Sequence, residues 1–344
     1  MIPEHDTHIR KRLCNLFKEY FGIAPEGVTA LPHSGSNRQY FRLSHANITA
    51  LGVYNENLKE NLAFTHFTRQ FLQFRINVPK IYIENLAQNI YLVEDLGDTQ
   101  LLKWLIEHSK PGTFSEEARV IYQKVIRELV KIQILAGRNF DYRHCFPYQT
   151  FQKESILFDL NYFKKYFVDT LNIRSKTTRL ARDFNQLSEY LLQDTELFFM
   201  YRDFQARNIM LVDQEPYFID YQGGRKGALP YDPASLLFQA KARIPNEERE
   251  RLIHYYLKVA RLFTPIQEDK FMEKYYAFAL IRVLQTLGAY GLRGIIEKKR
   301  HFIESIPYAI QNLDYLIRQN KIINHLPSLK DTLQQIIHHQ SKLL

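Results

Sequence analysis

The pattern of apolar and polar positions changes near residue 95. Residues 6–21 place apolar side chains three or four positions apart, which predicts an amphipathic helix. The following segment has short apolar runs separated by turn-forming residues, and only residues 60–75 return to helical spacing. The short runs predict antiparallel strands at residues 28–31, 39–43, 48–54, 80–84 and 90–93.

Beyond this point the pattern is mainly helical. The expected helices cover residues 98–108, 115–137, 151–169, 177–193 and, in several pieces, 247–340. A compact group of short strands interrupts them at residues 197–221. Since 344 residues exceed what one compact core usually holds, we predict an α+β fold with two lobes. Residues 1–95 would form a small antiparallel sheet with a helix, and residues 96–344 a mainly helical C-terminal lobe.

The chain carries an excess of positive charge. Its formal net charge is +9, which favours anionic partners such as nucleotides or acidic sugars. The two cysteines, Cys14 and Cys145, have neither a zinc-ligand spacing nor the pattern of a disulfide framework. No stretch approaches the roughly 20 apolar residues of a membrane helix, and the N-terminus lacks the apolar core of a signal peptide. We therefore expect a cytoplasmic protein without a membrane partner.

Residues 197–232 contain the polar groups that indicate a reaction. An apolar strand leads into a polar loop, and two further short strands follow, so that Asp203, Asn208 and Asp220 stand at loop edges of one compact unit. Asp203 and Asn208 have the D-x-x-x-x-N spacing of kinase catalytic loops. In phosphoryl transfer an aspartate orients the attacking hydroxyl, while an amide oxygen and a second carboxylate hold Mg²⁺ on the phosphates of ATP.

This spacing alone is a weak signal, because it arises by chance in many chains. The alternative is a polar loop in a helical protein, with Asp220 as an ordinary turn residue. The strand–loop–strand–turn–strand context favours the catalytic interpretation. We predict Asp203 as the catalytic base, and Asn208 and Asp220 as the ligands of Mg²⁺.

The same segment resembles the aminoglycoside-phosphotransferase and choline-kinase-like family. Residues 202–208 (RDFQARN) resemble its catalytic loop, residues 219–222 (IDYQ) its metal-binding segment, and residues 227–234 its G-x-x-x-Y-D-x-A element. The chain resembles most the branch of bacterial anomeric kinases that act on N-acetylmuramate and N-acetylglucosamine. Further matches to this branch are R-x-Y-F-R after a serine-rich turn at 34–42, L-x-E-D-L-G-D at 92–98 and R-x-L-x-x-L-G-x-Y at 282–290.

This resemblance implies a protein-kinase-like fold with ATP in the cleft between the lobes. It implies phosphorylation of the anomeric hydroxyl of an N-acetylated amino sugar, as in cell-wall recycling. The partner would be a small-molecule sugar, with no nucleic acid. We expect a monomer that acts with a separate sugar-phosphate nucleotidyltransferase.

Two regions supply candidate contacts to the nucleotide. The small residues of the turn at 34–37 would let backbone N–H groups approach phosphate, although an ordinary hairpin turn is the alternative. Residues 94–96 would contact adenine through their backbone, or serve only as a linker. Since residues 48–54 contain no lysine, an arginine of the preceding hairpin would bind the phosphates instead. The candidates are therefore Ser34, Gly35, Ser36, Asn37, Arg38, Arg42, Glu94, Asp95 and Leu96.

Four further residues are expected to support the catalytic loop, namely Arg202, Gln205, Arg207 and Asp232. The two arginines would stabilise the transferring phosphate or bind an acidic substrate, with a structural ion pair as the alternative for each. Asp232 would brace the loop or cap the helix that follows it. Tyr201 stands where the family usually has histidine, and it would take over part of the histidine's support of the loop.

Three other interpretations stay open from the sequence. One is a kinase for another small alcohol, such as an aminoglycoside, a choline-like compound or homoserine. The second is a catalytically silent nucleotide- or sugar-binding relative, which Tyr201 and the missing strand lysine would support. The third, a nucleic-acid-binding protein, rests on charge alone and finds no recognised motif. The basic charge favours a neutral or acidic sugar over a polycationic aminoglycoside.

Overall fold

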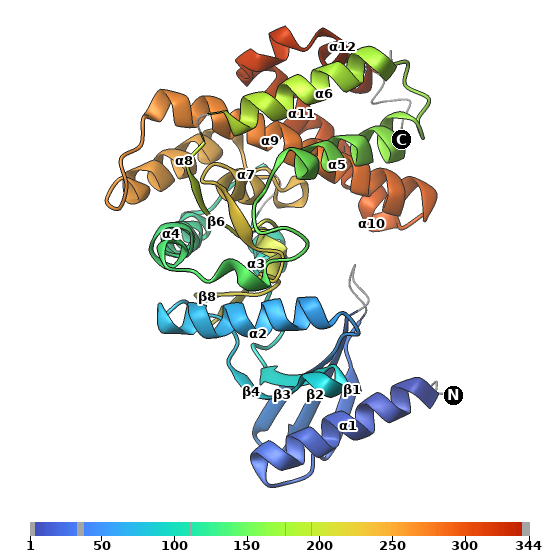
Figure 1. Cartoon of the computed structure of the whole chain (residues 1–344), viewed down its shortest axis with the longest axis vertical. Coiled ribbons are helices and arrows are strands. Elements are labelled where there is room, and N and C mark those ends of the chain that lie inside the picture. Colours follow the sequence, from blue (N-terminus) through green and yellow to red (C-terminus); the bar gives the residue numbers. More distant parts are fainter. Residues whose placement is uncertain (1–3, 33–37, 110–111, 176, 194, 339–344) are drawn as a thin grey trace.

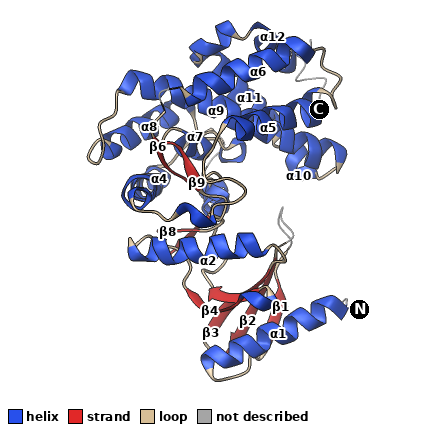
Figure 2. Ribbon diagram, in the orientation of Figure 1, coloured by secondary structure: helices blue, strands red, loops and turns tan. Residues whose placement is uncertain are grey.

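The structure is a computed structural model that describes residues 4–32, 38–109, 112–175, 177–193 and 195–338. Within these residues the N-terminal part forms a five-stranded antiparallel sheet in the order β1-β2-β3-β5-β4 (Figure 1). Its strands are β1 (Gly27–Ala30), β2 (Gln39–His45), β3 (Ile48–Tyr54), β4 (Ile81–Asn85) and β5 (Ile90–Glu94). Helix α1 (Glu4–Phe21) lies across the outer face of the sheet, and α2 (Leu58–Gln73) lies between the sheet and the rest of the chain (Figures 1 and 2).

The two faces of the sheet have different partners because side chains alternate along each strand. On the outer face, Phe41 and Leu43 of β2 are buried with Ile90 and Leu92 of β5 against apolar residues of α1. Gly52 of β3 lies under this helix, where an added Cβ would come within 2.8 Å of Leu43 and 3.0 Å of Leu13, so a larger residue would force these leucine side chains to move. The inner face carries Tyr40, Leu51, Val53, Tyr91 and Val93, which line a cavity described below.

Helix α2 connects the sheet to the remainder of the molecule. The Asn57 side chain caps its first turn by accepting the backbone N–H of Glu60. Phe71 packs edge-to-face on Phe199 with ring centroids 5.4 Å apart, and the Thr68 hydroxyl lies 2.5 Å from the Tyr221 hydroxyl. One apolar cluster therefore runs from the inner face of the sheet through α2 into the helical part.

The helical part surrounds α9, which is buried on most of its circumference, as expected of a helix that is apolar all round. Helix α9 packs against α5, α7 and α11. The helices are α3 (Leu101–His108), α4 (Glu116–Val130), α5 (Lys153–Phe163), α6 (Thr177–Leu192), α7 (Tyr231–Leu237), α8 (Asn246–Ala260), α9 (Glu268–Tyr290), α10 (Arg300–Ile303), α11 (Ile306–Gln319) and α12 (Pro327–His338).

Two short hairpin-like pairs of strands lie between α6 and α7. Strand β6 (Leu197–Met200) pairs with β9 (Arg225–Ala228), and β7 (Ile209–Val212) pairs with β8 (Glu215–Phe218). Strand β9 is absent from the sequence-based prediction, because its residues Arg-Lys-Gly-Ala lack an apolar pattern. Its pairing of Arg225 with Met200 brings the chain after Asp220 back beside the start of the polar loop.

The predicted α+β architecture is confirmed, with a small antiparallel sheet followed by a mainly helical chain. Predicted and observed elements differ mainly at their ends; β7 begins at Ile209, so Asn208 belongs to the loop. The division into two lobes at residue 95 stays a prediction. Among the described residues, no helix combines the length and the apolar character that a bilayer-spanning segment needs.

Candidate active site

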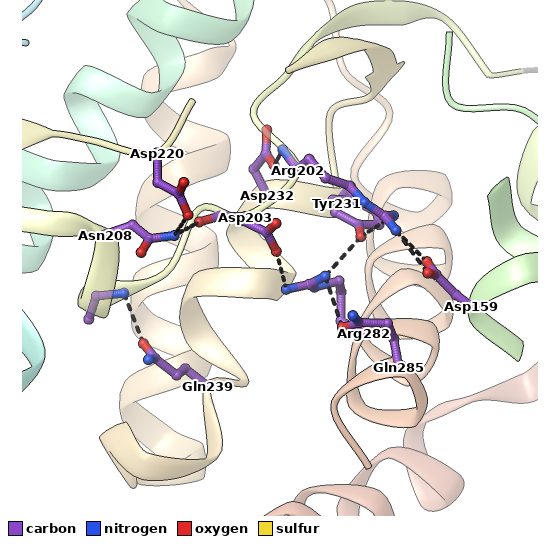
Figure 3. Close-up of polar contacts among 11 residues, drawn as sticks. Asp159, Arg202, Asp203, Asn208, Asp220, Tyr231, Asp232, Gln239, Arg282 and Gln285 are labelled. Carbon is purple, nitrogen blue, oxygen red and sulfur yellow. Dashed lines mark hydrogen bonds and ion pairs between the residues drawn. The ribbon is translucent and has the colours of Figure 1, made fainter. Parts of the chain in front are cut away.

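The polar loop between β6 and β7 brings the three predicted oxygen-bearing side chains together (Figure 3). The Asn208 Nδ2 donates to the backbone oxygen of Asp203 at 2.8 Å and to Oδ2 of Asp220 at 3.2 Å. The pairing of β7 with β8 places Asp220 beside Asn208, because Ile209 is opposite Phe218. Asp203, five positions before Asn208, and Asp220, twelve positions after it, thus both contact Asn208.

The Asp203 carboxylate is ionised and faces a buried arginine. Arg282 of α9 is 3% exposed, and its Nη2 lies 3.2 Å from Oδ1 of Asp203. Burial favours the neutral acid, but the charges of Arg282, Arg202 and Arg207 outweigh it and hold the pKa of Asp203 below its ordinary value. A carboxylate of this kind can accept a hydrogen bond from a substrate hydroxyl at neutral pH.

Asp220 has the opposite electrostatic environment. Burial and the negative charge of Asp203 raise the pKa of Asp220, although Gln222 donates to its Oδ1 at 2.7 Å. A cation placed between the two carboxylates would remove this repulsion. Asp220 also has a φ of 68°, a left-handed conformation that Asp and Asn tolerate better than most residues.

Asp232 braces the catalytic loop through its backbone. Its carboxylate accepts the N–H of Tyr201 at 2.8 Å, the N–H of Arg202 at 3.0 Å and Nε2 of Gln133 at 3.0 Å. Burial raises the pKa of Asp232 to about 7. Asp232 lies in the first turn of α7 but makes no capping bond there, since Pro230 occupies the cap position. Two roles were expected for Asp232, bracing the loop and capping the helix. The observed contacts are those expected if Asp232 braces the loop.

Of the other supporting candidates, Arg202 anchors the loop to helix α5. Arg202 donates to both oxygens of Asp159 in α5 at 2.7 and 2.9 Å, so its charge is engaged in a structural ion pair. The backbone N–H of Ala206 donates to Gln239 at 2.8 Å (Figure 3). Gln205 is buried and Arg207 is exposed beside the loop.

Two cavities meet at this loop. The first has about 470 Å³ and lies between the inner face of the sheet and the loop, where Asn208 and Asp220 form part of its wall together with Glu94 and Leu96. The second has about 390 Å³ and lies between the loop, α7, α9 and the segment around residue 301, with Asp203 and Gln205 in its wall. Gln100 and Arg207 line both cavities. Asp203 thus faces one cavity while its hydrogen-bonded neighbour Asn208 faces the other.

A family model described as "Phosphotransferase enzyme family" matches residues 27–268, which include the sheet, the loop and most of the helices that anchor it. This chain belongs to that phosphotransferase family. The phosphotransferase is similar to kinases of N-acetylmuramate and N-acetylglucosamine from two bacteria. It is 23% identical to the enzyme of Neisseria meningitidis over 306 residues, covering 87% of each chain, and 22% identical to that of Pseudomonas putida over 350 residues, covering 96% of each.

Solved structures show the same fold. An amicoumacin kinase in complex with AMP-PNP and Ca²⁺ has a TM-score of 0.61 at 12% identity, over 84% of this chain and 86% of that one. A choline kinase from Cryptosporidium parvum has a TM-score of 0.60 at 16% identity, over 96% of this chain and 99% of that one. The resemblance to aminoglycoside phosphotransferases and choline kinases, and the protein-kinase-like fold, are confirmed. The phosphotransferase is a small-molecule kinase.

The residues at the loop fit a metal ion held jointly with a nucleotide. Asn208 uses its amide nitrogen for the contacts to Asp203 and Asp220, which turns its side-chain oxygen toward a ligand. Among the described residues no cluster of three or more His, Cys, Asp or Glu forms a metal site, so a metal here would need further ligands from phosphate or water. This two-ligand arrangement suits Mg²⁺ bound to ATP.

The two arginines predicted as phosphate ligands, Arg38 and Arg42, have different contacts in the structure. Arg42 binds both oxygens of Asp95 at 2.7 and 3.0 Å and also contacts Asp98, so it ties β2 to the segment after β5. Arg38 is 4% exposed and lies 3.2 Å from Glu60 of α2. The positive charge of Arg38 offsets part of the rise in the pKa of Asp220. Arg38, rather than Arg42, is therefore the arginine near Asp220, the predicted metal ligand.

Some site residues were predicted and others were not. The candidates Ser34, Gly35, Ser36 and Asn37 lie outside the described residues. Asp95 is engaged by Arg42, whereas Glu94 and Leu96 line the first cavity. The prediction missed Glu60, Asp159 and Arg282, although Arg282 opens the late R-x-L-x-x-L-G-x-Y element, which was a usable signal.

Tyr201 joins the loop that carries Asp203 to the segment that carries Asp220. Its buried hydroxyl donates to the backbone oxygen of Ile219 at 2.6 Å, and its ring packs edge-to-face on Phe204. Replacing Tyr201 with phenylalanine leaves this carbonyl without its side-chain donor, and we expect a loss of about 1–3 kcal/mol in the free energy of unfolding. Urea denaturation followed by circular dichroism measures the change, and a variant as stable as the original chain would show that this hydrogen bond does not support the loop.

Proposed function

We propose that this phosphotransferase transfers the γ-phosphate of ATP to the anomeric hydroxyl of an N-acetylated amino sugar. The observation that carries the proposal is the position of Asp203 in the wall of the second cavity, next to Asn208 and Asp220 in the wall of the first. The nucleotide would occupy the first cavity and the sugar the second. The similarity to N-acetylmuramate/N-acetylglucosamine kinases supports this class of acceptor.

Asp203 would act as the base that accepts a hydrogen bond from the attacking hydroxyl. Its ion pair with Arg282 fixes the orientation of the carboxylate and keeps it ionised, while Arg282 itself is held by the Tyr231 hydroxyl at 3.1 Å. Asn208 and Asp220 would hold Mg²⁺, which would offset the charge developing on the phosphates. The braced backbone of the loop would keep the two substrates aligned, and such positioning supplies much of the rate in phosphoryl transfer.

Arg38 would take the role of the strand lysine that other kinases use to bind the α- and β-phosphates. Arg38 forms an ion pair with Glu60 on α2. In protein kinases the strand lysine likewise pairs with a glutamate on a helix. We expect Arg38→Met to raise the KM for ATP about 10- to 100-fold, the loss of one charge-assisted hydrogen bond to phosphate.

Two variants serve as controls for Arg38→Met. Arg38→Lys retains the charge and should recover part of the affinity for ATP. Arg69→Met removes a cation of α2 that is paired with Glu84 of β4, and it should leave the KM unchanged. An Arg38→Met enzyme with an unaltered KM for ATP would exclude Arg38 from phosphate binding.

A screen for ATP consumption tests the proposed acceptor. The purified chain would be incubated with ATP, Mg²⁺ and each of N-acetylmuramate, N-acetylglucosamine, an aminoglycoside, choline and homoserine. Nuclear magnetic resonance of the product would locate the phosphate. The proposal predicts turnover with the N-acetylated sugars and a phosphate on the anomeric oxygen. Turnover with only the aminoglycoside or an amino alcohol would contradict it.

A further inference from the structure

The second cavity has an unbalanced positive charge. Its wall contains the side chains of Arg207, Lys241, Arg282 and His301, and among the described residues that line it Asp203 is the one carboxylate. Arg282 already forms the ion pair with Asp203, so these two charges offset each other. The positive charge that remains belongs to Lys241 and Arg207.

Lys241 and Arg207 lie close enough to repel each other. Burial lowers the pKa of Lys241; the charge of Glu304 opposes this effect, and the charge of Arg207, which acts less strongly than Glu304, adds to it. Within the described part of the chain, neither Lys241 nor Arg207 has a carboxylate within salt-bridge distance of its charged group. The nearby Glu304 instead binds Arg300 at 2.7 Å. A half-buried lysine beside a second cation, with no acid in direct contact, is suited to binding an anionic ligand.

The remainder of the cavity is suited to a neutral, hydroxyl-rich ligand. Gln205, Gln285 and Thr286 supply amide and hydroxyl groups to its wall. The hydroxyl of Ser235 is buried in the same wall and has no hydrogen-bond partner among the described residues. This hydroxyl is closed off from the cavity surface, so Gln205, Gln285 and Thr286 are the polar groups that can contact a neutral part of a ligand.

We propose that Lys241, with Arg207 beside it, binds a carboxylate on the acceptor, so that the enzyme prefers an acidic amino sugar to the neutral sugar of the same ring. This inference rests on the proposed function and specifies which member of the acceptor class the cavity selects. An ammonium in contact with a carboxylate forms a charge-assisted hydrogen bond, which is about twice as strong as a neutral one. The neutral amides and Thr286 would bind the hydroxyl and acetamido groups that both sugars share.

The test compares N-acetylmuramate, which has a carboxylate, with N-acetylglucosamine, which lacks it, at saturating ATP. The native enzyme should have the larger kcat/KM for N-acetylmuramate. In Lys241→Met the ratio of the two kcat/KM values should fall about 10- to 100-fold, the loss of one charge-assisted contact. Lys241→Arg, which retains the charge, should keep much of the ratio.

A matched control uses Lys299, whose ammonium lies 2.9 Å from Glu297 and does not line the cavity. Lys299→Met should leave the ratio unchanged, and equal thermal unfolding midpoints would show that each variant is folded. Equal losses for both sugars in Lys241→Met, or no preference in the native enzyme, would overturn the carboxylate subsite while the kinase function stands. If the native enzyme turns over neither of the two sugars, the proposed function itself is wrong.

Discussion

Replacing Asp203 with asparagine is expected to lower kcat about 10²- to 10⁴-fold, the usual contribution of a positioned base. Asparagine has nearly the same size and can still accept the hydrogen bond from Arg282, but it cannot accept the proton of the attacking hydroxyl. The affinity for ATP should change little, because Asp203 lines the second cavity and not the first. Steady-state kinetics and calorimetry with ATP measure the two quantities separately.

The matched control for this variant is Asp213→Asn. Asp213 is exposed in the turn of the β7–β8 hairpin, which follows the Asp203 loop and lies outside both cavities at this position, and its φ of 51° is tolerated by asparagine. This control should have the activity of the native enzyme. If Asp203→Asn turns over as fast as the control, Asp203 is not the base and the proposed chemistry is wrong.

Replacing Asp220 with asparagine is expected to weaken the binding of ATP in the presence of Mg²⁺ at least about 10- to 100-fold, since disturbing even the residues around a metal ligand has this effect. Asparagine is the informative choice because residue 220 has a φ of 68°, which alanine would adopt only with strain. The variant keeps an oxygen that can accept the hydrogen bond from Gln222 but loses the negative charge that binds the metal.

The comparison with and without metal separates this role from a change in folding. In EDTA the native enzyme should lose turnover, and the native and Asp220→Asn proteins should bind ATP with similar, weak affinity. Adding Mg²⁺ should then strengthen binding by the native enzyme alone. Equal strengthening of both proteins by Mg²⁺ would contradict the assignment of Asp220 as a metal ligand.

Much of the fold could be predicted because its information is local. The strands β2 and β3 are short apolar runs bounded by turn-forming residues, and this local pattern was enough to predict them. Strand β9 could not be found in this way. Its Arg225–Ala228 sequence has no alternation, and it exists because its backbone pairs with β6 across 25 or more residues of chain.

The same distinction holds for the active site. Asp203, Asn208 and Asp220 lie within one compact unit of short strands. Their proximity could therefore be predicted from the sequence. Arg282, Asp159 and Lys241 come from other elements and reach the loop only through helix packing. No local pattern marks an arginine of a long helix as the partner of an aspartate 79 positions earlier.

Arg38 and Arg42 illustrate why sequence could not choose between two candidates. Arg38 directly precedes β2, and Arg42 lies within it. Because the two residues are four positions apart, the alternation of a strand directs both side chains to the same face. The register of the sheet decides, because Arg42 is opposite Leu51, and Leu51 is opposite Val93, just before Asp95. Arg42 therefore meets the acidic residues after β5, and Arg38 lies at the other end of the strand near Glu60 and Asp220.

A crystal structure with Mg²⁺, a non-hydrolysable ATP analogue and N-acetylmuramate tests the account most directly. We predict the nucleotide in the first cavity, the metal on Asn208 and Asp220, and an anomeric oxygen about 2.6–3.2 Å from the Asp203 carboxylate. A nucleotide bound outside that cavity, or a sugar whose anomeric hydroxyl makes no contact with Asp203, would contradict it.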